Sequence, residues 1–299
     1  MVIKLHAFWY CMNDRGYRKQ PGHFHQCCPY CMYMLTLYLR RLTCKTAGMV
    51  RCQPLPSTGN LLTPDNFSRL IMAIPEYSVL SVPHALELQK QWDSPVWRQA
   101  PALHIAAFRP ESTNHHPRTE AKLLCSPAAL HGFFRVRDRY VRCVHTQFQQ
   151  AVYKDSCVEF FVQPKAGGGY FNFEFNCGGA MLASYIVDPS RVAHGFKDFT
   201  RLTTEQGSQV SIYHTLPTLV EPEICDDITW LIEFSIPFAL LEQYAGPLGD
   251  IKGRVWRANF YKCADETSHP HWAAWSPVDE LNFHLPRCFG RIRFVAVSK

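Results

Sequence analysis

Tyr170-Phe-Asn-Phe-Glu-Phe-Asn176 alternates aromatic and polar side chains with a period of two. In a β-strand successive side chains point to opposite faces of the sheet, so the three phenylalanines fall together on one face. That apolar face is predicted to be buried. The opposite face suits recognition of a hydroxyl-rich ligand, although an ordinary solvated strand face is the alternative for this segment alone. It carries phenol, amide and carboxylate groups from Tyr170, Asn172, Glu174 and Asn176.

Short stretches with strand character recur from about Ile74 onward, separated by proline, glycine, asparagine and aspartate. They cover residues 103–108, 133–141, 156–162, 229–236, 255–262 and 291–297. Only Pro237 to Tyr244 has helical character, and Gly246 is suited to end that helix. Many short strands with one short helix predict an all-β fold, an antiparallel β-sandwich. Residues 188–226 show little pattern and are predicted to form a long loop or insertion.

The first quarter of the chain differs in composition from the rest. Residues 1–53 are aromatic, basic and rich in cysteine without clean periodicity, and residues 54–66 have the composition of a linker. We therefore expect residues 1–71 to be a poorly ordered extension and linker, with a natural start at Met72. Residues 72–299 are expected to form the β-sandwich domain.

Positive charge is concentrated in the same region. Residues 1–71 contain nine lysines and arginines against two aspartates, a surplus of seven. The whole chain carries a net charge of +6, so residues 72–299 come to −1. The basic balance is therefore no argument that the main domain binds nucleic acid. No apolar run approaches the length that spans a bilayer, so we expect no membrane partner.

Cysteine is distributed unevenly as well. Six of the thirteen cysteines fall in the first 52 residues, and the other seven are dispersed singly. An odd, dispersed set predicts free buried thiols rather than a disulfide framework, which favours a reducing, cytoplasmic location; we expect no secretory signal after Met1. Cys28 and Cys31 have the two-residue gap of a zinc-binding turn, but a second pair at matching spacing is missing.

Trp256 to Pro286 is the second informative region. Its loop His269-Pro-His-Trp-Ala-Ala-Trp275 carries two tryptophans three residues apart. Large apolar rings are costly to expose without a purpose, and sugar rings offer C–H patches that stack on such faces. The alternative is that one of the two indoles fills the end of the sandwich. The chain contains no nucleophile elbow, P-loop or dinucleotide fingerprint.

Several of these motifs, taken in order, resemble the family 9 carbohydrate-binding modules, in particular the free-standing family 9-like proteins. The similarity covers about three quarters of the chain, residues 74–299. It rests on Asp155-Ser-Cys-Val-Glu159-Phe-Phe, Tyr170–Asn176, Trp230-Leu-Ile-Glu-Phe-Ser-Ile-Pro237, Trp256-Arg-Ala-Asn-Phe-Tyr-Lys262, Trp275-Ser-Pro277 and Phe289-Gly290. The resemblance implies a β-sandwich related to the DOMON fold that binds a sugar, often at a chain end, between two aromatic rings.

The resemblance also implies positions for the binding residues. The first ring of the clamp, six residues before Glu159, is Tyr153, where characterised modules have tryptophan; the second falls on Trp272 or Trp275. An arginine expected on the neighbouring strand is replaced by Glu174, and an asparagine expected before the second ring is also absent. These departures put recognition of a reducing-end sugar in doubt. The expected polar contacts with sugar hydroxyls come from Glu159, Asn172, Glu174 and Asn176.

Other functions remain open at this point. His269, His271 and His284 could form a metal site of a cupin-like enzyme, although Pro270 argues for a loop and no carboxylate has suitable spacing. A haem-binding DOMON-type domain would need axial ligands such as Met181 and His194. Calcium is conceivable but unassigned, because the aspartate pair at 226–227 is too sparse. Hydrolysis of a glycosidic bond is disfavoured, because two carboxylates would have to flank that bond. It is kept as an open alternative. The sequence thus predicts a non-catalytic carbohydrate-binding β-sandwich without a catalytic residue or an assigned cofactor.

Overall fold

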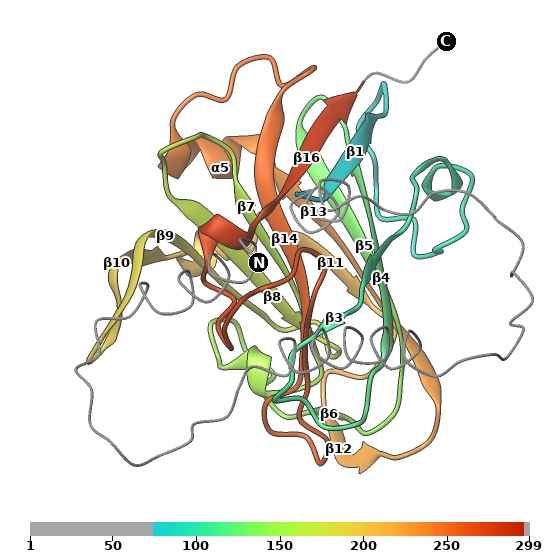
Figure 1. The fold of residues 1–299 in the computed structure, drawn as a ribbon. Coiled ribbons are helices and arrows are strands. Elements are labelled where there is room, and N and C mark those ends of the chain that lie inside the picture. The colour runs from blue at the N-terminus through green and yellow to red at the C-terminus, as the bar shows by residue number, and fades with distance from the viewer. Residues whose placement is uncertain (1–73, 296–299) are drawn as a thin grey trace, which may run out of the picture. The chain divides into compact units, whose positions relative to one another are not determined.

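The computed structural model describes residues 74–295, which form sixteen β-strands, two short α-helices and three 3-10 helices (Figure 1). The helices are η1 (Trp97–Gln99), η2 (Val152–Lys154), α4 (Thr204–Gly207), α5 (Phe238–Ala245) and η3 (Pro286–Cys288). The strands are β1 (Glu76–Ser81), β2 (Leu103–Ile105), β3 (Ala107–Phe108), β4 (Arg118–Cys125), β5 (Ala129–Asp138), β6 (Val141–Cys143), β7 (Cys157–Gln163), β8 (Tyr170–Asn176), β9 (Met181–Val192), β10 (Gly195–Arg201), β11 (Ser211–His214), β12 (Val220–Ile224), β13 (Ile228–Pro237), β14 (Val255–Cys263), β15 (Trp272–Ala274) and β16 (Gly290–Val295).

One continuous hydrogen-bonded path runs through most of these strands in the order β10-β9-β8-β7-β14-β16-β1-β4-β5-β13-β11. Most neighbours are antiparallel, but β1 runs parallel to both β16 and β4 and joins the two halves of the path. The path folds back on itself, because aromatic side chains from its two halves meet. The rings of Phe175 on β8 and Phe234 on β13 stack with centroids 5.0 Å apart. The predicted all-β sandwich is confirmed.

The alternation in β8 places its phenylalanines as the sequence predicts. Phe171, Phe173 and Phe175 are fully buried in the core between the two layers. The opposite, polar face is not solvated either, since Glu174 is only 4% exposed and Asn176 fully buried. Side chains from the β9–β10 hairpin and from residues 274–289 cover much of this face. The polar row is therefore interior, and the solvated-face alternative is wrong.

The segment 188–226, expected to be a loop, is the main correction to the predicted fold. It contains the end of β9, all of β10, helix α4 and strands β11 and β12. Strands β9 and β10 form a hairpin that extends the sheet beyond β8 (Figure 1). Most residues of β10 are half-buried or exposed on both faces, so the hairpin lacks the hydrophobic alternation that reveals a strand in a sequence.

Helix α5 agrees with the predicted helix to within one residue. Gly246 follows it with a φ of 69°, a conformation that favours glycine, and its backbone N–H donates to Glu242 O at 2.9 Å. The predicted extension 1–71, with Cys28 and Cys31, lies outside the described residues. Within residues 74–295, no helix has the length and apolar character needed to cross a membrane.

Gly132 on β5 provides a test of the packing between the two layers. Its Cα lies against the Phe234 ring, and a Cβ would overlap that ring. We expect Gly132→Ala to lower the free energy of unfolding by about 1–3 kcal/mol, measured by urea denaturation, because a well-packed core must shift to admit a methyl group. Gly168→Ala, in an open hairpin turn, is the matched control. Equal unfolding midpoints for the two variants would contradict the packing described here.

Candidate functional site

A cavity of about 540 Å³ opens over the polar face of β7, β8, β9 and β14. This volume lies within the range of about 300–1,000 Å³ that is usual for small-molecule sites. Strand residues form its floor, and they are Glu159, Asn172, Glu174, Ser184 and Cys263. The walls come from η2, from the β9–β10 hairpin and from the segment between β14 and η3, and include Tyr153, Arg191, His194, Phe196, Phe199, Asp265, Trp272, Phe283 and His284.

The strand register brings two carboxyl groups together on the floor. Glu159 of β7 lies directly opposite Glu174 of β8, and opposed side chains on neighbouring antiparallel strands have Cβ atoms about 4.5–5.5 Å apart. The Asn172 side chain holds one of them, because its Nδ2 donates to Glu174 Oε1 at 2.8 Å. Asn172 Oδ1 accepts a hydrogen bond from the backbone of Ser184 at 2.8 Å. Glu174 Oε2 is buried and has no partner.

Desolvation raises the pKa of both floor glutamates. The pKa of Glu174 rises to about 7, mainly through burial, while the Asn172 hydrogen bond opposes this rise. The pKa of Glu159 lies well above its ordinary value through burial, with further repulsion from Cys263 and Glu174. Burial also raises the pKa of Asp265 at the rim. A buried carboxyl that keeps its proton can donate a hydrogen bond as well as accept one.

Two aromatic rings, those of Tyr153 and Trp272, line the cavity near its rim. Trp272 Nε1 donates to Asp265 Oδ1 at 2.7 Å, which fixes the indole. The backbone N–H of Asp265 donates to Tyr153 O at 3.2 Å, so the same residue ties both ring-bearing segments together. The Tyr153 side chain belongs to an exposed residue, 37% accessible, which leaves its ring available for a ligand.

The opposite wall combines a cation with aromatic side chains. The guanidinium of Arg191 lies 4.1 Å from the ring centroid of Phe196, and the Phe196 ring lies 4.3 Å from that of His284. His284 Nδ1 and the Tyr170 hydroxyl are hydrogen-bonded at 2.9 Å. Burial, helped by Arg191, lowers the pKa of His284 to about 3, so its imidazole is neutral near neutral pH. The β9–β10 hairpin thus contributes an arginine to the cavity lining.

Two residues expected to touch a ligand lie outside the cavity. Trp275 packs edge-on against Phe260 with ring centroids 5.7 Å apart, and its indole rests over Gly290. Asn176 is fully buried, and its Nδ2 donates to His145 O and to Asp155 Oδ2 at 2.7 and 2.8 Å. Trp275 therefore packs within the sandwich and Asn176 holds a loop, and neither side chain lines this cavity. Of the two candidate indoles, Trp272 lines the cavity.

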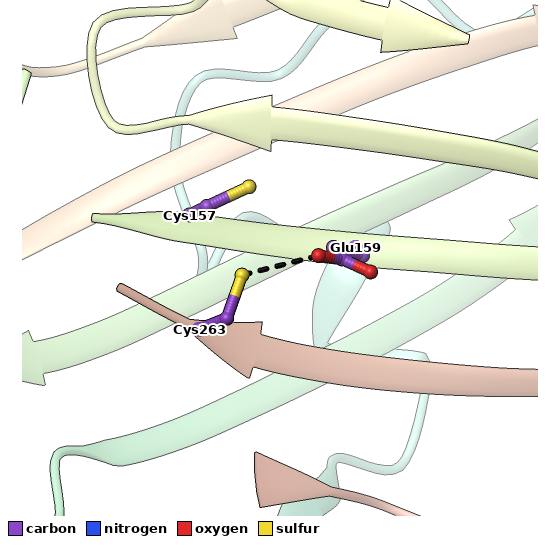
Figure 2. Close-up of side chains that lie close together, drawn as sticks. All are labelled: Cys157, Glu159 and Cys263. Carbon is purple, nitrogen blue, oxygen red and sulfur yellow. Dashed lines mark hydrogen bonds between the residues drawn. The ribbon is translucent and has the colours of Figure 1, made fainter. Parts of the chain in front are cut away.

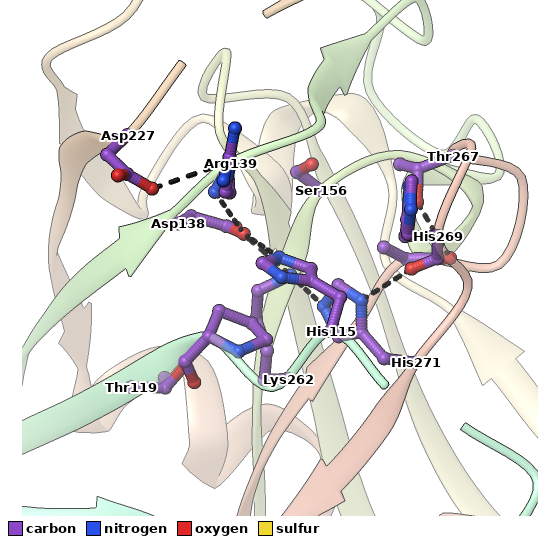
Figure 3. A network of polar contacts seen from close by, with 12 residues as sticks. His115, Thr119, Asp138, Arg139, Ser156, Asp227, Lys262, Thr267, His269 and His271 are labelled. Atoms are coloured by element: carbon purple, nitrogen blue, oxygen red, sulfur yellow. Dashed lines mark hydrogen bonds and ion pairs between the residues drawn. The ribbon is translucent and has the colours of Figure 1, made fainter. Parts of the chain in front are cut away.

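The histidines proposed for a cupin-like metal site do not converge. His271 is buried, with Lys262 Nζ 2.8 Å from its Nε2 and the backbone oxygen of His269 2.8 Å from its Nδ1 (Figure 3). The lysine belongs to a buried ion pair with Asp138, at 3.5 Å. His284 lines the cavity instead, with Tyr170 as its partner. The structure therefore does not bring these three side chains to one place, and Lys262 Nζ occupies the position next to His271 Nε2.

The two candidate axial ligands for a haem lie in different parts of the structure. His194 lines the cavity, whereas Met181 is 3% exposed and packs in the core between the layers. The two candidate axial ligands are therefore not presented to one site. No calcium-binding set emerges either: among residues 74–295, the one group of three potential metal-ligating side chains close together is Cys157, Glu159 and Cys263.

Comparisons with known proteins agree with this fold. The profile of Carbohydrate-binding family 9 matches residues 98–294, and the chain belongs to that family. The crystal structure of a proposed carbohydrate-binding protein from Bacteroides uniformis is similar with a TM-score of 0.64 and 24% identity, covering 74% of this chain and 100% of that one. No curated protein sequence matches the chain.

Two further structures are family 9 carbohydrate-binding modules from Caldicellulosiruptor kristjanssonii, one in complex with glucose and one with cellotriose. Their TM-scores are 0.48 and 0.49, their identities 12% and 13%, and they cover 74% and 75% of this chain. This chain in turn covers 97% and 96% of theirs. The expected family resemblance is thus confirmed by the profile match.

The raised pKa of Glu174 predicts a pH dependence of folding stability. Because its folded-state pKa of about 7 exceeds the ordinary 4.5, its contribution to stability is fully present below pH 4.5 and is lost as pH rises through about 7. Glu174→Gln removes this loss, so the unfolding free energy of the variant relative to wild type should increase between about pH 5 and about pH 8, by up to roughly 3 kcal/mol. Urea denaturation at both pH values measures the difference.

Glu205→Gln, at an exposed position on α4, is the control and should show no such increase. A constant stability difference between Glu174→Gln and wild type across this pH range would show that Glu174 is solvated and ionised throughout.

Proposed function

We propose that this protein binds carbohydrate without catalysing its turnover, and that the saccharide occupies the cavity between Tyr153 and Trp272. The observation that carries the proposal is the pairing of two rim aromatics with a carboxyl- and amide-lined floor in a member of a carbohydrate-binding family. Pyranose rings present apolar C–H faces and a polar equatorial edge. Aromatic walls and a polar floor complement these two surfaces.

Hydrogen bonding at the floor fits hydroxyl groups, which both donate and accept. Glu174 Oε2 has no partner within the protein and can accept from a hydroxyl. Burial raises the pKa of Glu159, which favours the protonated carboxyl that can donate to a hydroxyl oxygen. Arg191 adds donors from the opposite wall. In the free protein, the unpaired buried oxygen Glu174 Oε2 raises the free energy of the folded state. A ligand hydroxyl that donates to this oxygen removes that penalty, which makes the free energy of binding more favourable.

The placement of the two glutamates favours binding over hydrolysis. Both project from neighbouring strands of one sheet and approach a ligand from the same side. A glycosidase places its two carboxyl groups across the scissile bond, with one on each side of the sugar ring. We therefore assign Glu159 and Glu174 to hydroxyl recognition.

For the ligand itself we propose a short segment, or the end, of a xylan- or cellulose-type chain, in the context of polysaccharide catabolism. Equatorially substituted pyranoses have two flat faces, which two rings can contact together. We also propose that the domain spans residues 72–299; the family profile lies within this range.

The test is a glycan-array screen of the full chain, followed by calorimetric titration with glucose, cellotriose and xylotriose. Tyr153→Ala and Trp272→Ala should each weaken binding of the best ligand by at least about tenfold, because buried aromatic anchors commonly contribute more than about 1.4 kcal/mol. Trp275→Phe, which alters an indole outside the cavity, should bind as wild type does. Tyr153 is exposed, so its substitution tests binding without disturbing the core.

Two results would overturn the proposal. One is the absence of binding to any glycan by folded wild-type protein. The other is a loss of binding in Trp275→Phe that matches the loss in Trp272→Ala.

A further inference from the structure

We propose that Cys157, Glu159 and Cys263 form a binding site for a thiophilic divalent metal ion, with zinc the best match. The three side chains lie close together (Figure 2), and two of them, Glu159 and Cys263, line the cavity. No step of saccharide recognition requires either cysteine, and the site is argued from the geometry of the sheet alone.

Strand geometry brings the three donor groups together. Cys157 and Glu159 are two residues apart on β7, so both project from the same face. Cys263 of β14 is the registered partner of Cys157, which places it directly across on the neighbouring strand. A sheet with hydrogen bonds on both sides of β7 holds this arrangement rigidly.

The distances match those of a metal site. One donor atom from each residue lies within 4.8 Å of the other two, and Cys263 Sγ donates to Glu159 Oε1 at 3.1 Å. Zinc binds thiolate at about 2.3 Å and carboxylate at about 2.0–2.2 Å in tetrahedral geometry, so neighbouring ligand atoms stand about 3.4–3.8 Å apart.

The site has access and an open position. Glu159 and Cys263 line the cavity, while Cys157 is fully buried behind them. Three protein ligands with a fourth position facing a cavity is the arrangement of zinc sites that keep an exchangeable ligand. Directly across from Glu159, the unpartnered Glu174 Oε2 points to a missing positive or hydrogen-donating partner at this place.

The acidic side chains of the cavity also offer oxygen ligands for a cation. The acidic groups Glu159, Glu174 and Asp265 line it, together with one thiol, against the arginines 191 and 201. On binding, a metal ion would displace the protons of the two thiols and would place a positive charge beside these acidic side chains. Two sulfur ligands select zinc or a similarly soft ion over calcium and magnesium.

The test uses the full chain under reducing, anaerobic conditions, titrated with Co²⁺ as a spectroscopic substitute for zinc and then with Zn²⁺. We expect thiolate-to-cobalt charge-transfer absorption with the intense visible bands of tetrahedral cobalt, and their displacement by zinc. Cys157→Ser/Cys263→Ser should lose one metal equivalent per chain, measured by equilibrium dialysis and elemental analysis. Cys225→Ser/Cys288→Ser, the matched double control, should keep it. These two cysteines lie outside the cavity lining, and Cys225 is exposed.

Glu159→Gln is the second variant, and it tests the proposed metal site if the double serine variant fails to fold. It leaves both thiols in place and should weaken cobalt binding by at least tenfold while thermal unfolding of the metal-free protein stays cooperative. Comparison with the Cys225/Cys288 control removes any contribution from cysteines elsewhere, including Cys28 and Cys31.

Three outcomes would overturn the proposal. They are the absence of charge-transfer absorption in the wild-type protein, equal metal content in wild type and both site variants, and a Cys157–Cys263 disulfide that persists after reduction and blocks the thiols. The titration contains no saccharide, so its failure would leave the proposed carbohydrate binding untouched.

Discussion

The constraint on which this molecule depends is the burial of a polar sheet face. Strands β7, β8 and β14 place phenylalanines toward the core on one side and carboxyl, amide and thiol groups on the other. In an ordinary sandwich that second side would meet water. Here the β9–β10 hairpin and the segment that follows β14 cover it, so Glu159 and Glu174 lie opposite each other in a desolvated place.

This arrangement lowers the free energy of unfolding and leaves a polar atom without a partner at the cavity floor. A buried carboxylate oxygen without a partner costs about 1–3 kcal/mol or more, and the raised pKa of Glu174 reports the same cost in another form. The hydrogen bonds of the surrounding sheet and the packing of the phenylalanine face offset this penalty, because they fix the strands. A ligand that supplies the missing partner therefore meets a preformed site, in which little has to be ordered on binding.

The sequence predicts the sheet better than it predicts the walls around the cavity. Alternation assigns Phe173 to the core and Glu174 to the other face, and the resemblance implies a ring clamp of Tyr153 with either Trp272 or Trp275. Periodicity reports which face a side chain takes, but not what covers that face. For this reason periodicity does not indicate that Asn176 and Trp275 lie outside the cavity lining, where each is enclosed by segments distant in sequence.

The sequence does not predict the cavity wall formed by the β9–β10 hairpin, for a related reason. Arg191 lies on a hairpin with little hydrophobic alternation, so the sequence gives no sign that it returns over the floor. The contact of Cys263 with Glu159 depends on the register between β7 and β14, which is set by packing of the entire sheet. The spacing Cys157-x-Glu159 was a usable signal for part of that cluster, because alternation alone puts the two side chains on one face.

The most direct measurement is a crystal structure of the full chain bound to the oligosaccharide that a glycan array selects. A pyranose ring is predicted between Tyr153 and Trp272, with its hydroxyl groups within hydrogen-bond distance of Glu159 and Glu174. A ligand seated at another surface, with this cavity unoccupied, would contradict the role assigned to the buried polar face.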